Sequence, residues 1–67
     1  MHKAVKIFYV NHRGVASYRN IIPISIEFKS TEWHPAEHWI LTAFDLDKKA
    51  DRGFAVNDIQ EWEVISE

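Results

Sequence analysis

The sequence predicts a small all-β fold, and three observations support this class. Several runs alternate apolar and polar residues with a period of two, which is typical of strands. Polar or glycine-containing segments of hairpin length separate these runs. No stretch shows the length and periodicity of a substantial helix. The chain has 67 residues, which is enough for one small domain, residues 1–67, with a limited core.

The N-terminal half predicts a hairpin followed by a long bent strand. Ala4–Val10 alternates β-branched and aromatic residues with other residues and is expected to be a strand. Asn11–Gly14 is expected to be a turn, because Gly14 adopts positive φ without strain. Val15–Ile22 returns as the second strand of the hairpin. Because Pro23 lacks a ladder donor, it marks an edge, bulge or bend, so Ile21–Lys29 is expected to bend there.

The middle of the chain predicts a loop, a buried strand and a turn. Ser30–Glu37 is polar and is expected to form a loop, with one helical turn at Pro35, because proline suits a first helical position. His38–Leu46 carries apolar residues on both faces and is expected to be a strand buried on both sides. Asp47–Asp51 is a charged turn.

The C-terminal segment completes the predicted sheet. Arg52–Val56 is expected to be a strand, Asn57–Ile59 a short turn or single helical turn, and Trp62–Ile65 a last short strand. About five short strands with short connections favour a small, strongly bent, five-stranded antiparallel barrel of the Sm-like or SH3-like kind.

The composition excludes several classes of protein. The chain has no cysteine, so disulfides and thiolate metal sites are excluded. No long apolar run predicts a signal peptide or a membrane-spanning helix, so a cytoplasmic protein with no membrane partner is expected. No pairing of nucleophile and base, phosphate-binding glycine loop or dinucleotide fingerprint is present. The sequence therefore predicts neither an enzyme nor a bound cofactor.

The charges are distributed unevenly along the chain. Residues 1–30 contain five Lys or Arg and one acid, whereas residues 31–67 contain three Lys or Arg and nine acids. A basic half is able to meet a phosphate or an acidic partner. Alternatively, the two halves interleave in one fold and partly neutralise each other.

A pattern spread over residues 5–59 resembles a known family. Its elements are Ile7-x-Tyr9, Arg19, Pro23, Trp39-Ile40-Leu41 with Ala43 and Asp45, and Arg52-Gly53-Phe54-Ala55-Val56-Asn57-Asp58-Ile59. Together they resemble a WYL domain. The resemblance implies a five-stranded Sm-like barrel. It also implies binding of nucleic acid or nucleotide-type ligands through a basic patch, in bacterial regulators where the barrel usually follows a DNA-binding helix-turn-helix.

The matched positions divide into agreements and departures. Arg19 and Arg52 match arginines of the family, and Trp39 and Leu41 match the first and third letters of its signature. Ile40 stands at the signature tyrosine. Ala55 and Asp58 stand where the family usually has arginine, so two phosphate-binding forks are lost. We therefore expect a polyanion to bind more weakly here than in a typical member.

The predicted ligand-binding residues are Arg19, Arg52, Lys6 and Tyr9. Small barrels bind single strands by combining cations with aromatic platforms. The wider basic set could line one surface beside aromatic residues, or it could be scattered and solvated; it comprises Lys3, Lys6, Arg13, Arg19 and Lys29, with Tyr9, Tyr18 or Trp33 as stacking partners. Strand alternation places Lys6 on the face opposite Tyr9, so these residues do not all share one face.

Two further patterns contain candidate metal ligands. His34-Pro-Ala-Glu-His38 spells H-x-x-E-H, which binds zinc on a long helix. No long helix is expected here, so two solvated loop histidines or a weak site with Glu32 are the alternatives. Asp45, Asp47 and Asp51 crowd a turn, but lysines occupy positions where calcium ligands would lie. No metal site is predicted.

Three aromatic residues and one leucine complete the expectations. Trp39, Leu41 and Phe54 are expected in the core. Trp62 is expected either to plug the barrel end or to form a subunit contact.

Two functions remain open at this stage. The first is a non-catalytic regulatory module that binds a nucleotide or single-stranded nucleic acid, or modulates a larger complex. The second is a protein-interaction module, such as a phage or mobile-element modulator or inhibitor of a host protein, which uses a strand edge or the acidic half. The absence of a DNA-binding helical segment in this sequence suits a stand-alone barrel in such an accessory protein. Few edge-blocking residues favour pairing into a homodimer.

Overall fold

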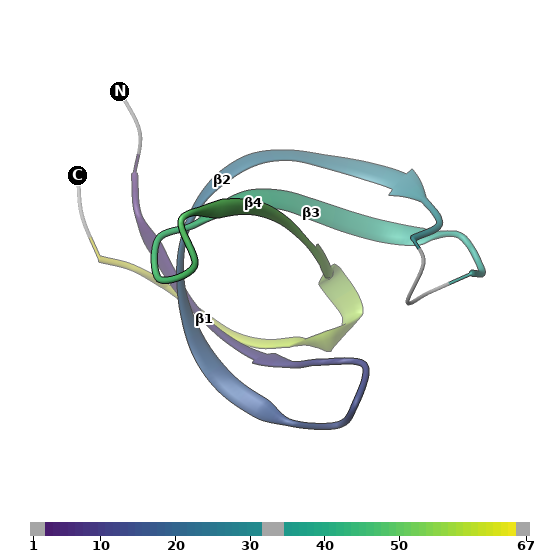
Figure 1. The fold of residues 1–67 in the computed structure, drawn as a ribbon, viewed down its shortest axis with the longest axis horizontal. Coiled ribbons are helices and arrows are strands. Elements are labelled where there is room, and N and C mark those ends of the chain that lie inside the picture. The colour runs from purple at the N-terminus through teal and green to yellow at the C-terminus, as the bar shows by residue number, and fades with distance from the viewer. Residues whose placement is uncertain (1–2, 32–34, 66–67) are drawn as a thin grey trace.

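A computed structural model describes residues 3–31 and 35–65, and this part of the chain is all-β (Figure 1). Five antiparallel strands form one sheet in the order β4-β3-β2-β1-β5. The elements are β1 (Val5–Val10), β2 (Ala16–Lys29), β3 (His38–Asp45), β4 (Ala50–Ala55), the 3-10 turn η1 (Val56–Asp58) and β5 (Ile59–Val64). The predicted all-β class is confirmed, and η1 lies where a short helical turn was expected.

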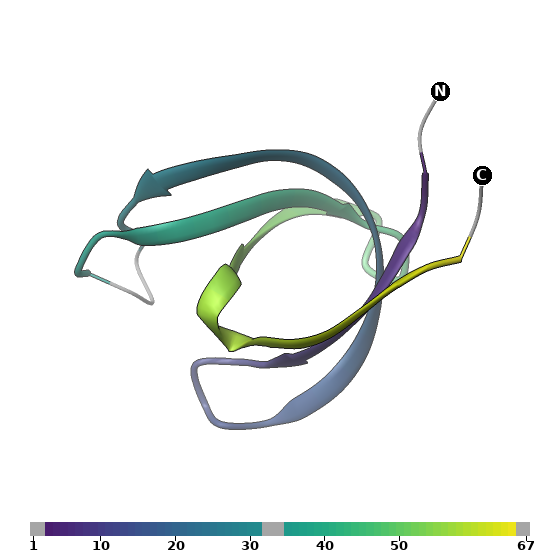
Figure 2. The ribbon, with the colours of Figure 1, turned by 180° about the vertical axis from the view of Figure 1, so that it is seen from behind.

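The strand β2 lies at the centre of the sheet, between β3 and β1. Its 14 residues join what the sequence suggested as two overlapping segments. Residues 16–21 pair with β1 and residues 21–29 pair with β3, with a register shift between Pro23 and Ser25. Figures 1 and 2 show β2 curving strongly along its length. The predicted bend near Pro23 is confirmed, because an irregular ladder lets the strand change direction there.

The sheet curls on itself but is not closed into a barrel. The two edge strands, β4 and β5, are joined through η1, and no ladder pairs them within the described residues. At the other side of the sheet, β1 pairs with β5 and brings the two ends of the described chain together. Val5 lies opposite Val64, and the Ile65 amide donates to the Ala4 carbonyl at 2.9 Å.

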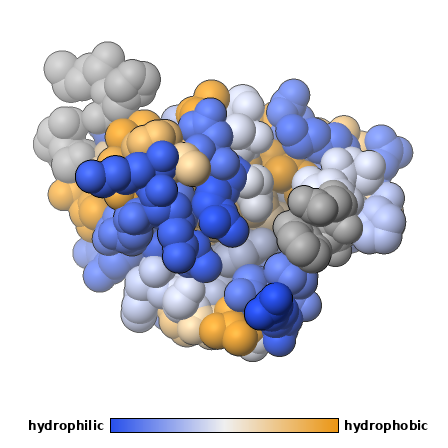
Figure 3. All heavy atoms as spheres, in the orientation of Figure 1, coloured by the Kyte–Doolittle hydropathy of each residue, from blue (hydrophilic) through white to orange (hydrophobic). Residues whose placement is uncertain are grey.

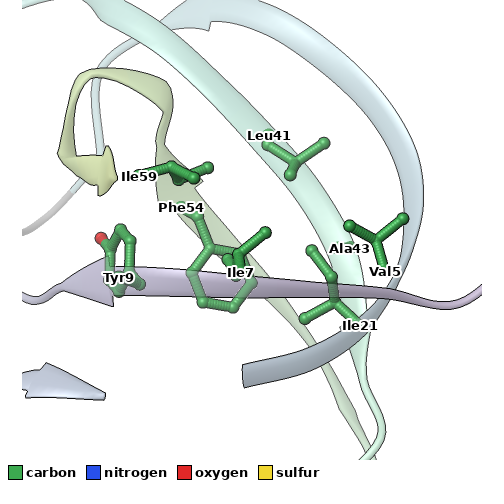
Figure 4. Close-up of a cluster of buried hydrophobic side chains, with 8 residues drawn as sticks. All are labelled: Val5, Ile7, Tyr9, Ile21, Leu41, Ala43, Phe54 and Ile59. Carbon is green, nitrogen blue, oxygen red and sulfur yellow. The ribbon is translucent and has the colours of Figure 1, made fainter. Parts of the chain in front are cut away.

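The core fills the inner face of this curled sheet. It is built from all five strands (Figure 4) and comprises Val5, Ile7, Tyr9, Ile21, Leu41, Ala43, Phe54 and Ile59. Leu41 and Phe54 are each 2% exposed, which confirms their predicted place. The expectation that β3 is buried on both faces holds in part, because Ile40 is buried on the outer face while Thr42 and Phe44 are only half-buried.

The prediction that Trp39 lies in the core is wrong. Trp39 is 56% exposed, and its cross-strand neighbour Phe28 is 53% exposed. Their rings pack edge to face with centroids 5.3 Å apart. The β2–β3 hairpin projects past the other strands (Figures 1 and 2), so its distal end continues the inner face beyond the part that β1, β4 and β5 cover.

Trp62 does not plug the sheet, because it is 52% exposed on the edge strand β5. The expected loop at residues 30–37 falls partly outside the described residues. Trp33 and His34 lie outside them. Within the described ranges, no helix is long and apolar enough to cross a membrane.

Candidate ligand-binding site

A cavity of about 110 Å³ opens at one end of the inner face. Its walls come from β1, β2, β4 and the β1–β2 turn, and they comprise Tyr9, Asn11, His12, Arg19, Arg52, Gly53 and Phe54. Three of the four predicted ligand-binding residues, Tyr9, Arg19 and Arg52, therefore meet at one cavity although they lie far apart in the sequence.

Strand register explains why these side chains converge. Residues directly opposite each other on antiparallel strands share a face of the sheet. Arg19 lies opposite Ile7, and Arg52 lies opposite Ala43. Because Ile7 and Ala43 are core residues, both arginines emerge on the inner face. Tyr9 follows Ile7 by two residues on β1 and shares that face.

Arg19 is held in place by two neighbours. Its Nη1 donates to Asp45 Oδ2 at 3.1 Å, and its Nε donates to Ser17 Oγ at 3.1 Å. The Arg19 side chain is 18% exposed and that of Asp45 is 0% exposed. The guanidinium is therefore oriented before any ligand arrives, which reduces the entropy that binding costs.

Asp45 belongs to the family pattern, but its contact with Arg19 was not predicted from the sequence. Besides Arg19, it accepts hydrogen bonds at Oδ1 from the backbone amides of Asp47 and Lys48, at 2.9 and 3.1 Å. One buried carboxylate thus shapes the β3–β4 turn and anchors a cavity arginine. The available signal was an aspartate immediately before a polar turn, where such side chains bind nearby amides.

Tyr9 forms a wall of the cavity and part of the core at once. Its ring packs edge to face on Phe54 with centroids 4.9 Å apart, and Figure 4 shows its hydroxyl pointing away from Ile7 and Ile21. Burial raises the Tyr9 pKa above its ordinary value of 10.0. A hydrogen bond with the Ala55 backbone and the charges of Arg19 and Arg52 oppose this rise, and Asp58 adds to it. The phenol is therefore neutral at physiological pH and can act as a hydrogen-bond donor.

Arg52 supplies the exposed cation of the site. It lies on the edge strand β4 and takes part in none of the three ion pairs that join described residues. Next to it, Gly53 lies close to the Ile40 side chain of the neighbouring strand β3, since a Cβ added at Gly53 would lie 3.2 Å from Ile40 Cγ2. Arg52 is thus an exposed residue at the wall of the cavity.

The β1–β2 turn forms one wall of the cavity and is built by Asn11. Its Oδ1 accepts hydrogen bonds from the amides of Arg13 and Val15, at 2.9 and 3.0 Å. Gly14 has φ of 79°, and its amide donates to the Asn11 carbonyl. This self-contained turn places Asn11 and His12 at the cavity.

Lys6 is not brought to the cavity. It lies on the outer face, 3.9 Å from Glu63 Oε1 and 5.1 Å from the centre of the Tyr18 ring. Tyr18 in turn packs on Phe8, with ring centroids 4.8 Å apart. Lys6 and Tyr9 are therefore separated by the sheet, as strand alternation predicts.

The departures from the family pattern also separate by face. Ile40 and Ala55 lie opposite each other on β3 and β4, and both are buried, at 1% and 3% exposure. Their neighbours Leu41 and Phe54 face the core, so Ile40 and Ala55 face outward. Asp58 is the departure that acts at the cavity, through its charge near Tyr9. Arg19 and Arg52 thus remain at the cavity, and Asp58 places an acid near them where the family usually has an arginine.

The side chains around the cavity are of the kind that can bind an anion. Two guanidinium groups and a neutral phenol surround a small cavity. In residues 3–31 and 35–65, no group of three or more histidine, aspartate or glutamate side chains could hold a metal ion. Figure 3 shows hydrophilic residues gathered over β4 and the β3–β4 turn.

No protein-family model matches the chain, and no curated protein matches it. The resemblance to WYL domains therefore depends on the residues described above.

Proposed function

We propose that this protein is a non-catalytic regulatory module of the WYL kind that binds a phosphate group of a nucleotide or single-stranded nucleic acid at the Tyr9–Arg19–Arg52 cavity. The observation that carries this proposal is the convergence of these three side chains on one cavity. Guanidinium groups bind phosphate through paired hydrogen bonds.

The fold supports the same assignment. Five antiparallel strands form a strongly curved sheet whose edge strands are joined by a single 3-10 turn. Closure of this sheet into a barrel of the Sm-like or SH3-like kind is part of the proposal. So is a cytoplasmic role in a bacterium or phage, which follows from the resemblance.

The test is titration of the protein into fluorescently labelled single-stranded DNA and RNA, and into linear and cyclic oligonucleotides, at two salt concentrations. Anisotropy reports binding. We expect binding that weakens steeply with salt, because phosphate contacts release counterions. Arg52→Ala should weaken it further by about tenfold, since a charge-assisted pair is lost.

Arg13→Ala is the matched control. It removes the same charge from an exposed residue of the β1–β2 turn that is not a wall of the cavity. Binding that falls equally in both variants would show a response to net charge alone. Absence of binding at low salt would overturn the proposed function.

The edge strand β5 favours protein interaction as a second candidate function. Residues 60–64 are exposed and alternate Glu61 and Glu63 with Trp62 and Val64. An unpaired edge of this kind can accept a strand from a basic partner, such as a host protein. Capture of one defined partner that is lost in Glu61→Lys/Glu63→Lys and kept in Arg52→Ala would favour this function.

A further inference from the structure

We infer that the cavity selects a terminal phosphate, a phosphomonoester such as the 5′ end of an oligonucleotide, over the phosphodiesters within a strand. This inference rests on the proposed function and narrows its ligand to one chemical group.

The size of the cavity gives the first argument. The cavity has a volume of about 110 Å³. A phosphoryl group with its oxygens fits such a space.

The shape of the cavity gives the second argument. Its walls include Tyr9 and Phe54, which pack against each other in the core, and Arg19, which is held on Asp45. A terminal phosphate needs one exit, for its single ester bond. An internal phosphodiester needs two exits, one for each strand direction, and so cannot enter to the same depth.

The available donors give the third argument. A phosphomonoester carries close to two negative charges at neutral pH and presents three terminal oxygens, whereas a phosphodiester carries one charge and presents two. The contacts of Arg19 within the described residues engage its Nη1 and Nε, which leaves Nη2 for a ligand. Arg52 adds a second guanidinium and Tyr9 adds a hydroxyl. Three donor groups thus meet three acceptor oxygens.

The experiment compares one short oligonucleotide in three forms, each labelled at its 3′ end. The 5′ end carries a hydroxyl, a phosphate, or a phosphate capped by a methyl ester. The capped end keeps a 5′ phosphate but has two ester bonds and one charge. We expect the phosphorylated form to bind about tenfold or more tightly than the other two.

Two variants locate this preference. Arg52→Ala and Tyr9→Phe should reduce the ratio of affinities between the phosphorylated and hydroxyl forms, because each removes one donor from the cavity. Phe keeps the ring that packs on Phe54. Arg13→Ala should leave the ratio unchanged. Thermal unfolding of each variant confirms that it is folded.

The outcomes separate this inference from the proposed function. Equal binding of all three forms, weakened by Arg52→Ala, would keep the proposed function and overturn the terminal selectivity. Binding of none of the forms would overturn both. A preference for the phosphorylated form that persists in Arg52→Ala and Tyr9→Phe would place the phosphate outside this cavity and would also overturn the inference.

Discussion

At the scale of single residues, the pair formed by Arg19 and Asp45 is central to both fold and site. Asp45 is fully buried and accepts hydrogen bonds from Arg19 and from two amides of the β3–β4 turn. Asp45→Ala leaves a largely buried cation and both amides without this acceptor. We expect the free energy of unfolding to fall by about 3 kcal/mol, measured by urea denaturation.

The pair of Glu27 and Lys29 is a natural control for this change. Its 3.0 Å separation matches the 3.1 Å of the buried pair, but its side chains are 55% and 44% exposed. Because solvent screens such a pair, Glu27→Gln should change stability by less than about 0.5 kcal/mol. Similar losses in the two variants would contradict the role assigned to burial.

Tyr9 should make the stability of the fold depend on alkaline pH. Burial raises its pKa in the folded chain above the ordinary value of 10.0, so the folded state holds the phenol proton more tightly than the unfolded state. Its contribution to stability is full below about pH 10 and is lost as the pH rises beyond that value. Urea denaturation from about pH 9 to about pH 11 measures this decline.

Tyr9→Phe should flatten the decline, whereas Tyr18→Phe, which changes an exposed ring on the outer face, should leave it as in the parent protein. An unchanged decline in Tyr9→Phe would show that another group is responsible.

The residues of the site differ in how far sequence could predict them. Alternation along one strand separates Lys6 from Tyr9, because it is a local rule. The family resemblance pointed to Arg19 and Arg52. The link from Arg19 to Asp45 spans 26 positions in the chain and depends on how β2 pairs with β3, so no local pattern shows it.

At the scale of elements, the two glycines have different roles that substitution should separate. Gly14 in the β1–β2 turn has φ of 79°, and a Cβ added there would meet no atom within 4 Å. Gly53 on β4 instead has a close neighbour, since its Cβ would lie 3.2 Å from Ile40 Cγ2. Gly14→Ala should therefore cost about 1–2 kcal/mol through backbone strain alone.

Denaturation with urea measures this cost, and Gly14→Asn is the conservative control, because asparagine tolerates positive φ better than alanine. Equal stability of the alanine variant and the parent protein would show that the turn changes shape to relieve the strain.

The strands show where periodicity fails as a guide. The alternation of β2 and β3 correctly indicated strands, and Pro23 correctly indicated a bend. The alternation could not show that Trp39 is exposed. A period of two predicts which face of the sheet a side chain occupies, but not whether another strand covers that face. Trp39 lies on the same face as the core residue Leu41, yet beyond the part of that face that β1, β4 and β5 cover.

At the scale of the whole molecule, the uneven charge of the sequence is largely balanced by the topology. The acidic strand β5 lies beside β1, where Glu63 approaches Lys6, and β3 brings Asp45 to Arg19. The two halves of the chain thus interleave, which was the alternative expectation. The strand order decides which charged residues lie side by side, and the composition of the chain does not predict that order.

The pairing of β1 with β5 should make the C-terminal strand essential. A chain ending at Asp58 lacks β5 and the core residue Ile59, and β1 then loses one of its two neighbours. We expect this chain to lose its cooperative unfolding transition in urea, followed by circular dichroism. A chain ending at Ile65 keeps every strand and should retain the transition. Cooperative unfolding of the shorter chain would contradict this prediction.

The same pairing has a consequence for how the protein is made. A contact between Val5 and Val64 spans almost the full sequence, and such nonlocal contacts slow folding because a long loop must close first. During synthesis, β1 can pair with β2 early, but its other edge must wait until β5 has left the ribosome. The nascent chain therefore carries an open edge of β1 until residues 59–64 are available to pair with it.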